Sequence, residues 1–103
     1  MRLYKYTAIF TPEVEKDEVY YNVSVPALPE ITTFGESLEE AKFMAQDALE
    51  LVVLSRLEEG ETIPVDRKPK VLSKGAVTEE ILVTVSHDVK TTPVTDYVKA
   101  AFA

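Results

Sequence analysis

The sequence contains no cysteine, a single histidine and only three glycines. The absence of cysteine excludes disulfides, thiolate nucleophiles and cysteine-ligated metal centres. One histidine leaves a zinc site without enough nitrogen or sulfur ligands, and three widely spaced glycines cannot form a phosphate-binding loop. No apolar run approaches the roughly 20 residues that span a bilayer, and no signal-peptide pattern is visible at the N-terminus. We therefore expect a cytoplasmic protein with no cofactor and no membrane contact.

Positive charge is also scarce, since 11 Lys and Arg stand against 18 Asp and Glu and the formal net charge is −7. Most of the acidic excess falls in residues 11–18 and 36–61. Such a surface repels phosphate backbones and suits a basic protein partner, although it can also serve solubility alone. The one basic cluster, at residues 67–74, has no interleaved aromatic residues, so it predicts at most a weak nucleic-acid contact.

The first third of the chain has the pattern of three β-strands. Residues 3–11 are rich in strand-favouring types, and residues 19–26 alternate apolar and polar side chains. Residues 11–18 between them are charged and have the length of a hairpin loop. A short third strand is expected at residues 31–34. Three consecutive strands with short connections predict an antiparallel meander.

A helix over residues 38–59 is marked by clear signals at both ends. Ser37 and Glu40 form a capping box at its start, and Gly60 supplies a left-handed stop. Apolar residues at helical spacing form the expected sheet-facing stripe: Leu38, Ala41, Ala45, Ala48, Leu49 and Val52. Further apolar residues lie beyond this stripe, among them Phe43, Leu51 and Leu54. They predict a second buried surface, which is either a subunit interface of a dimer or tetramer or the contact of the C-terminal segment.

The last third begins with a long polar connection over residues 61–78, followed by a fourth strand within residues 80–89. Residues 94–103 fit either a short helix or a tail. The predicted class is therefore α+β, with a three-stranded antiparallel meander, one long helix and a further strand in the order β-β-β-α-β.

No residue pattern favours an enzyme. His87 lies between Ser86 and Asp88, but neighbours on a strand point to opposite faces and cannot form a catalytic triad. The acidic residues between positions 13 and 18 lack the spacing and the glycine of a calcium-binding EF-hand loop. A magnesium-dependent hydrolase is disfavoured because no aspartate lies in the middle of a predicted strand.

The order of landmarks from residue 25 to residue 64 resembles the HicB antitoxin family. That family has a Val-Pro-x-Leu-Pro-Gly loop, a threonine strand, Gly-Asp-Ser/Thr-x-Glu-Glu-Ala, and a helix that closes with Gly-Glu-x-Ile-Pro. This chain carries the corresponding segments Val25-Pro26-Ala27-Leu28-Pro29, Gly35-Glu36-Ser37-Leu38-Glu39-Glu40-Ala41 and Gly60-Glu61-Thr62-Ile63-Pro64. The resemblance implies a partial ribonuclease-H-like fold without catalytic acids. It also implies neutralisation of a HicA toxin, a small protein that cleaves messenger RNA.

The chain departs from the family pattern in two places. Glu30 stands where the family usually has glycine, so a different turn is expected after Pro29. Family members often carry a C-terminal DNA-binding module, and too few residues follow the fourth strand for one. The expected organisation is a HicB-like domain over residues 1–90 and an extension over residues 91–103, with no separate DNA-binding domain, which disfavours direct DNA binding.

The predicted function is that of a non-enzymatic, antitoxin-like module that neutralises a small basic HicA-like toxin by protein–protein contact. Residues predicted to contact the partner, through electrostatic steering or packing, are Glu13, Glu15, Asp17, Glu18, Tyr20, Leu28 and Pro29. The alternative is a solitary, self-assembling HicB-like structural or ligand-binding protein without a toxin partner. In that case Phe43, Leu51 and Leu54 form the oligomer interface.

Overall fold

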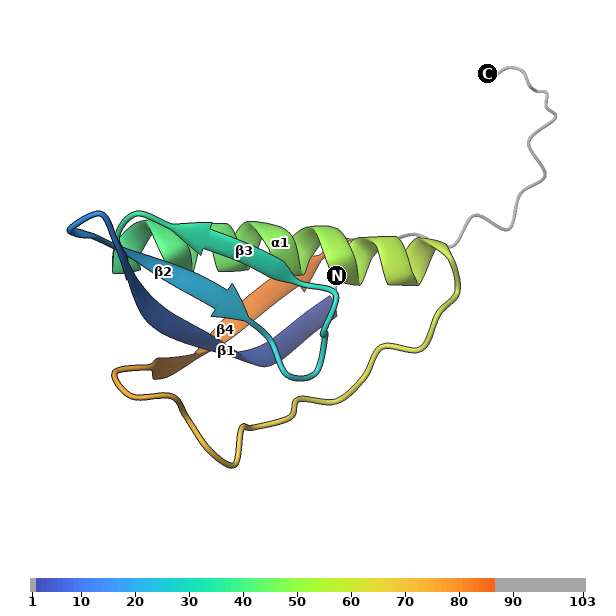
Figure 1. Cartoon of the computed structure of the whole chain (residues 1–103). Helices are drawn as coiled ribbons and strands as arrows, with labels where there is room; N and C mark the ends of the chain where they lie inside the picture. Colours follow the sequence, from blue (N-terminus) through green and yellow to red (C-terminus); the bar gives the residue numbers. More distant parts are fainter. Residues whose placement is uncertain (1, 87–103) are drawn as a thin grey trace, which may run out of the picture.

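The computed structural model describes residues 2–86 as a four-stranded antiparallel sheet with one helix packed on one face (Figure 1). The elements in chain order are β1 (Arg2–Glu15), β2 (Glu18–Ser24), β3 (Thr32–Gly35), α1 (Leu38–Glu58) and β4 (Val77–Val85). The strands lie in the order β3-β2-β1-β4. This arrangement confirms the predicted α+β class and the meander. His87, the helix or tail predicted at residues 94–103 and the domain boundary near residue 90 lie outside the described residues.

The β1–β2 hairpin differs from the prediction. The expected loop at residues 11–18 is wrong, because β1 continues to Glu15 and only Lys16 and Asp17 form the turn. Both turn residues have positive φ, 52° and 66°, which gives a two-residue connection that matches the twist of the strands. The ladder continues to this turn because Val14 pairs with Val19. The many charged residues at positions 11–18 indicated a loop, but cross-strand pairing extends both strands to the turn.

Strand β4 pairs antiparallel with β1, with Arg2 opposite Val85 and Phe10 opposite Val77. The strand begins and ends a few residues earlier than predicted. Beyond Phe10 only β2 accompanies β1, and Pro12 lies in this part of the strand. A proline is tolerated there because no neighbouring strand needs its missing N–H.

The core lies between α1 and the sheet face that carries alternate residues of β1, β2 and β4. The helix contributes four buried side chains, Ala41, Ala45, Leu49 and Val53. Small alanines at its N-terminal half allow the helix to approach the sheet closely, and larger residues fill the space farther along. The sheet side of the core includes Tyr6, Ala8, Phe10, Val23, Ile81, Val83 and Val85.

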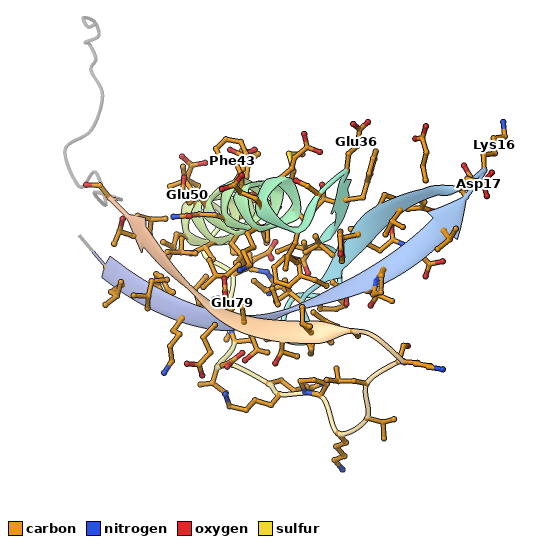
Figure 2. The ribbon with its side chains drawn as sticks, turned by 90° about the vertical axis from the view of Figure 1, so that its left-hand side faces the viewer. Lys16, Asp17, Glu36, Phe43, Glu50 and Glu79 are labelled. Atoms are coloured by element: carbon orange, nitrogen blue, oxygen red, sulfur yellow. The ribbon has the colours of Figure 1, made fainter. Side chains whose placement is uncertain are left out.

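Both predicted helix signals are confirmed. Ser37 Oγ accepts a hydrogen bond from the Glu40 N–H at 3.0 Å, and Glu40 Oε1 accepts one from the Glu36 N–H at 2.6 Å. At the other end Gly60 adopts φ 72°. Residues 61–76 then run without regular structure. Ile63 still packs against the core, whereas the part of the segment from Asp66 onward lies on the sheet face opposite α1 (Figure 2).

Candidate functional site

The sheet face opposite α1, called the outer face below, carries a hollow near the hairpin. Opposed residues share a face, and the pairs Glu13–Tyr20, Glu15–Glu18 and Asn22–Phe34 all lie on this side. A hollow of about 690 Å³ opens among them, lined by Glu15, Glu18, Val19, Tyr20, Asn22, Phe34 and Glu36. We call this feature the hairpin hollow. Two other hollows of the described residues have volumes of about 350 and 290 Å³.

Two aromatic rings form part of the hairpin hollow. The centroids of Tyr20 and Phe34 lie 6.0 Å apart at an interplanar angle of 78°, an edge-to-face contact. The Phe34 side chain is 55% exposed although it belongs to a strand, and Tyr20 is half-buried. Large apolar surface of this kind is typical of contact sites, and tyrosine is enriched among residues that dominate binding energy.

The rim of the hairpin hollow carries negative charge without internal compensation. Glu15 and Glu18 lie directly opposite each other on neighbouring strands, and like charges in this position destabilise a sheet. The ion pairs found within residues 2–86 join Lys5 and Lys68 to Glu80, Lys42 to Glu79 and Arg56 to Glu30. No cation of the described part of the chain therefore pairs with Glu15, Glu18 or Glu36. A cation from outside the chain would relieve the Glu15–Glu18 repulsion.

Six of the seven predicted partner-contact residues reach the surface, and they lie in three places. Glu15, Glu18 and Tyr20 line the hairpin hollow, and Glu13 lies beside it on the same face. Asp17 lies with Lys16 at the tip of the turn, where both side chains point away from the body of the protein (Figure 2). Pro29 is exposed in the loop after β2, at a distance in sequence from the hairpin.

Leu28 requires a correction, because it is fully buried in the core. Two consecutive turns place it there: the Leu28 N–H donates to Val25 O and the Ile31 N–H donates to Leu28 O, both at 3.0 Å. The side chain packs inside the domain and presents no surface to a partner.

Glu30, the residue that replaces the family's usual glycine, binds the helix. Arg56 Nε donates to Glu30 Oε2 at 2.9 Å, Arg56 Nη2 donates to Oε1 at 3.1 Å, and Arg56 Nη1 donates to Thr62 O at 3.1 Å. The backbone N–H of Glu30, together with the hydrogen bond and charge of Arg56, holds the pKa of the Glu30 carboxyl below its ordinary value, although partial burial opposes the shift. Sequence analysis recognised the departure but not this fork-like pair.

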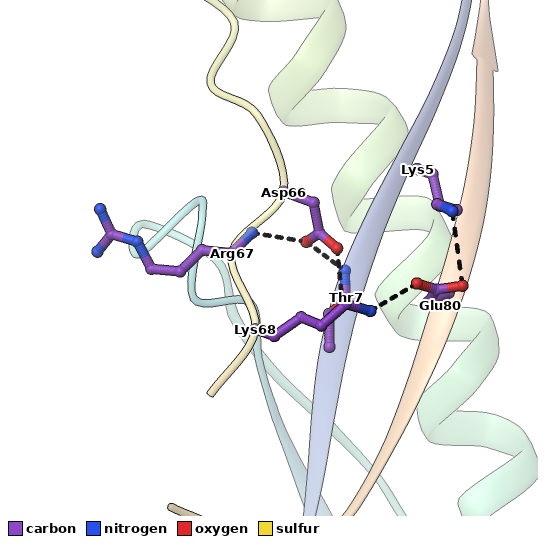
Figure 3. Close-up of polar contacts among 6 residues, drawn as sticks. All are labelled: Lys5, Thr7, Asp66, Arg67, Lys68 and Glu80. Carbon is purple, nitrogen blue, oxygen red and sulfur yellow. Dashed lines mark hydrogen bonds and ion pairs between the residues drawn. The ribbon is translucent and has the colours of Figure 1, made fainter. Parts of the chain in front are cut away.

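A second polar cluster on the outer face was also missed by sequence analysis (Figure 3). Asp66 Oδ1 accepts from the Thr7 N–H at 2.8 Å and Asp66 Oδ2 accepts from the Thr7 hydroxyl at 2.7 Å. Pairing between β1 and β2 ends where Ile9 is opposite Ser24, so Thr7 has no partner on β2. Asp66 binds Thr7 in its place. Burial raises the pKa of this carboxyl, but hydrogen bonds from Thr7 and from the Arg67 N–H outweigh that effect, so the pKa lies below its ordinary value.

The basic residues at positions 67–74 take part in this cluster. Lys68 Nζ lies 2.7 Å from Glu80 Oε2, and Lys5 Nζ lies 3.7 Å from Glu80 Oε1 (Figure 3). Pairing with Lys68 and the charge of Lys5 lower the pKa of Glu80. Part of the basic charge is therefore used to fasten the connection to β4, which supports a structural role for this segment.

Phe43 and Leu51 lie on the solvent side of α1, 70% and 64% exposed, and Leu54 is half-buried. Figure 2 shows Phe43 and Glu50 on the helix surface that faces away from the sheet. The described residues contain no cluster of His, Cys, Asp and Glu that could hold a metal ion. Nor does any helix between residues 2 and 86 have the length and apolar character required to cross a membrane.

Together these features define a small α+β protein with an antiparallel sheet, one covering helix and an acidic, aromatic hollow on the opposite face. A family model described as the HicB_like antitoxin of bacterial toxin-antitoxin systems matches residues 5–90. The chain therefore belongs to the HicB-like antitoxin family. No curated protein matches it in sequence.

Solved structures show the same fold. The N-terminal domain of antitoxin HicB from Burkholderia pseudomallei aligns with a TM-score of 0.59 at 22% identity, covering 81% of this chain and 99% of that one. A toxin–antitoxin complex from Streptococcus pneumoniae aligns with a TM-score of 0.66 at 18% identity, covering 95% and 88%. A further B. pseudomallei HicB structure gives 0.61 at 20% identity, covering 90% and 82%.

Proposed function

We propose that this chain is a non-enzymatic antitoxin that neutralises a small basic HicA-type toxin by direct protein–protein contact at the hairpin hollow. Family membership supports an antitoxin role, and one of the similar structures is a toxin–antitoxin complex. The observation that carries the proposal is the hairpin hollow itself, where the half-buried ring of Tyr20 and the exposed ring of Phe34 are bordered by three glutamates that lack a cation within residues 2–86.

The chemistry of the hairpin hollow matches a basic partner. A ribonuclease needs positive charge to hold its substrate, so the net charge of −7 attracts such a protein over a distance and steers it to the rim. An arginine or lysine of the partner placed over Tyr20 gains a cation–π contact of about 0.5–2 kcal/mol. The same cation separates Glu15 from Glu18 and removes their repulsion.

The remaining contact area comes from the surroundings of the hairpin hollow. A stable complex of standard size covers about 800 Å² on each partner, more than a single hollow offers. Glu13 beside the hollow and Asp17 at the turn extend the acidic surface, and we assign electrostatic steering of the partner to them. Occlusion of the toxin's RNA-binding surface by this acidic face would block cleavage without any chemical step in the antitoxin. The expected location is the cytoplasm, where the messenger RNA substrate is found.

The test is reconstitution with the small protein encoded beside this gene. Light scattering after gel filtration gives the mass of the complex, and a messenger-RNA cleavage assay gives the inhibition. The Tyr20→Ala/Phe34→Ala variant removes both rings from the hairpin hollow, whereas Phe43→Ala removes an exposed ring from the opposite side of the molecule. We expect inhibition to be lost in the first variant and kept in the second. Equal inhibition by both variants would refute the role of the hairpin hollow.

The solitary, self-assembling alternative is favoured by one observation, the exposure of Phe43 and Leu51 on α1. If the chain has no toxin partner, reconstitution yields a homo-oligomer alone and no inhibition of RNA cleavage. The predicted oligomer interface at Phe43, Leu51 and Leu54 is then the first surface to change, because exposed apolar helix surface is a common subunit contact.

A further inference from the structure

The outer edge of β4 has the properties of a pairing surface. Strand β4 lies at the end of the strand order, so β1 is its only neighbour in the described sheet. It has nine residues, Val77–Val85, and contains no proline, lysine or glycine. Proteins usually protect long edge strands with prolines, bulges or charged side chains, lysine above all, because an unprotected edge adds another strand. The charged residues of this edge are Glu79 and Glu80, and lysines of the same chain pair with both of them, Lys42 with Glu79 and Lys5 and Lys68 with Glu80.

The Asp66–Thr7 contact reveals which backbone groups of β4 point outward. The Thr7 N–H bonds to Asp66 and therefore points away from β4. Thr7 lies opposite Glu80 on β4, so these two residues form a pair without ladder hydrogen bonds. The backbone N–H and C=O of Glu80 therefore point away from β1, toward the free edge of β4. Alternation extends the same orientation to Thr78, Leu82 and Thr84. Within residues 2–86, no other group bonds to the outward backbone N–H or C=O of these four residues.

We propose that two copies of this chain associate through the outer edges of β4, with antiparallel strands related by a two-fold axis at Ile81. This axis places Glu80 opposite Leu82 of the second copy and Thr78 opposite its Thr84. All nine residues then overlap, and each opposed pair of outward-facing residues exchanges two hydrogen bonds. The two sheets become one continuous sheet, with both copies of α1 on the same face.

Charge and the overlap of the two strands together select this register over its neighbours. An axis at Glu80 would place the two Glu80 side chains directly opposite each other, which is unfavourable. An axis at Leu82 would leave the beginning of each strand unpaired. With the axis at Ile81 each Glu80 meets an apolar residue, and no pair of like charges is opposed.

The surfaces on both sides of the edge have room for a second strand. On the helix side, a hollow of about 350 Å³ lies along the edge, lined by Lys42, Gln46 and residues 79–82. The Ile81 side chains of the two copies would meet beside this hollow. On the outer face, Leu82 is 55% exposed and gains cover from the added strand. The proposal concerns the edge opposite β3 and is independent of the function of the hairpin hollow.

The first test is the mass of the full chain by sedimentation equilibrium, with the variants Leu82→Glu and Leu51→Glu. Both variants exchange an exposed leucine for a glutamate. In the Leu82→Glu dimer, the new glutamate of each copy lies opposite Glu80 of the other copy, which gives two repulsive pairs. We expect a wild-type dimer, a roughly tenfold or larger weakening in Leu82→Glu, and an unchanged dimer in Leu51→Glu. Circular dichroism checks that Leu82→Glu still folds. We expect it to fold, because the new glutamate lies opposite Lys5 on β1 of the same chain. A monomeric wild type, or a dimer lost only in Leu51→Glu, would overturn the proposal.

The second test measures the register directly, and uses the absence of native cysteine. The single variants Glu80→Cys and Leu82→Cys are oxidised separately and as a mixture. The proposed axis places residue 80 of one copy opposite residue 82 of the other, at a Cα separation near 5.5 Å that a disulfide can span. Cross-linking should therefore be fast in the mixture and slow in each variant alone. Equal rates in all three samples would contradict the proposed register.

Discussion

Replacement of Gly35 by alanine tests how tightly the sheet and helix are joined. Gly35 ends β3, is buried, and lies just before the helix N-cap Ser37. An added Cβ would lie 2.4 Å from the Ala41 backbone nitrogen, 2.7 Å from its Cα and 2.9 Å from the Glu40 carbonyl carbon. All three atoms belong to the first turns of α1, so no flexible side chain can move aside. The helix itself must shift away from β3.

Such a shift is costly because the start of the helix is fixed at several points. Movement of the first turns disturbs the capping contacts of Ser37 and Glu40 and opens the core at Ala41 and Ala45. Overpacking of a well-packed core costs about 1–3 kcal/mol, and contact with backbone atoms places this site at the upper end. A loss of about 3 kcal/mol in a domain of this size lowers the melting temperature by roughly 12–24 °C.

The assay is thermal and urea unfolding followed by circular dichroism, with Gly60→Ala as the matched control. Gly60 has φ 72° and no atom within 4 Å of an added Cβ, so its alanine variant carries only the cost of the left-handed conformation, about 1–2 kcal/mol. We expect Gly35→Ala to be clearly the less stable of the two. If Gly35→Ala retained wild-type stability, or lost less than Gly60→Ala, the inferred close approach of β3 and α1 would be refuted.

Three further predictions concern the polar contacts that hold the loops. Asp66→Ala leaves the buried Thr7 N–H and hydroxyl without their partner, so the free energy of unfolding measured with urea should fall by about 2 kcal/mol. An unchanged free energy of unfolding would contradict the role of Asp66. Folding lowers the pKa of Asp66, so the stabilisation by its carboxylate is present above the unfolded-state pKa and is lost as the pH falls through the folded-state pKa. The wild type should therefore lose more stability between pH 6 and pH 3 than Asp66→Asn. Equal pH dependence of the two proteins would refute this. Arg56→Ala breaks the fork to Glu30 and the contact with Thr62, and should cost about 1 kcal/mol in the same assay, with no change as the contrary result.

The regular elements were predicted because their signals are local. The capping box at Ser37 and the glycine at position 60 depend only on nearby residues, and both mark the helix ends observed. Alternation over residues 19–26 likewise placed Val23 and Val25 on one face, and both are buried, whereas Val19 of the same face is 47% exposed near the turn. Such patterns follow from the geometry of helices and strands, so they can be recognised without tertiary information.

The hairpin turn was misplaced because tertiary pairing overrode local composition. Charged residues at positions 11–18 indicated a loop, yet the Val14–Val19 pair continues the ladder to a turn of two residues, neither of them glycine. This change has a functional consequence. It moves Glu15 and Glu18 from a solvated loop onto the outer face, where they border the hairpin hollow.

The remaining parts of the site depend on contacts between distant segments. Phe34 joins Tyr20 only when β3 lies beside β2, and Asp66 reaches Thr7 only because the connection between α1 and β4 crosses to the outer face. Glu30 finds Arg56 across 26 positions of sequence. Leu28 is adjacent to exposed Pro29 and has no pattern that distinguishes it, so its burial became evident only from the two turns around it.

Docking of a basic toxin on the acidic hairpin hollow can be measured through the kinetics of association. Stopped-flow measurement of the association rate constant from 20 mM to 500 mM salt would compare the wild type, Glu15→Lys/Glu18→Lys and the control Asp47→Lys/Glu50→Lys. Both variants change the net charge equally, but the control residues are exposed on α1, away from the outer face. We predict association slowed by about tenfold or more at low salt in the first variant and much less in the control, with the difference vanishing at high salt. Equal rates for the two variants would contradict docking at the hairpin hollow.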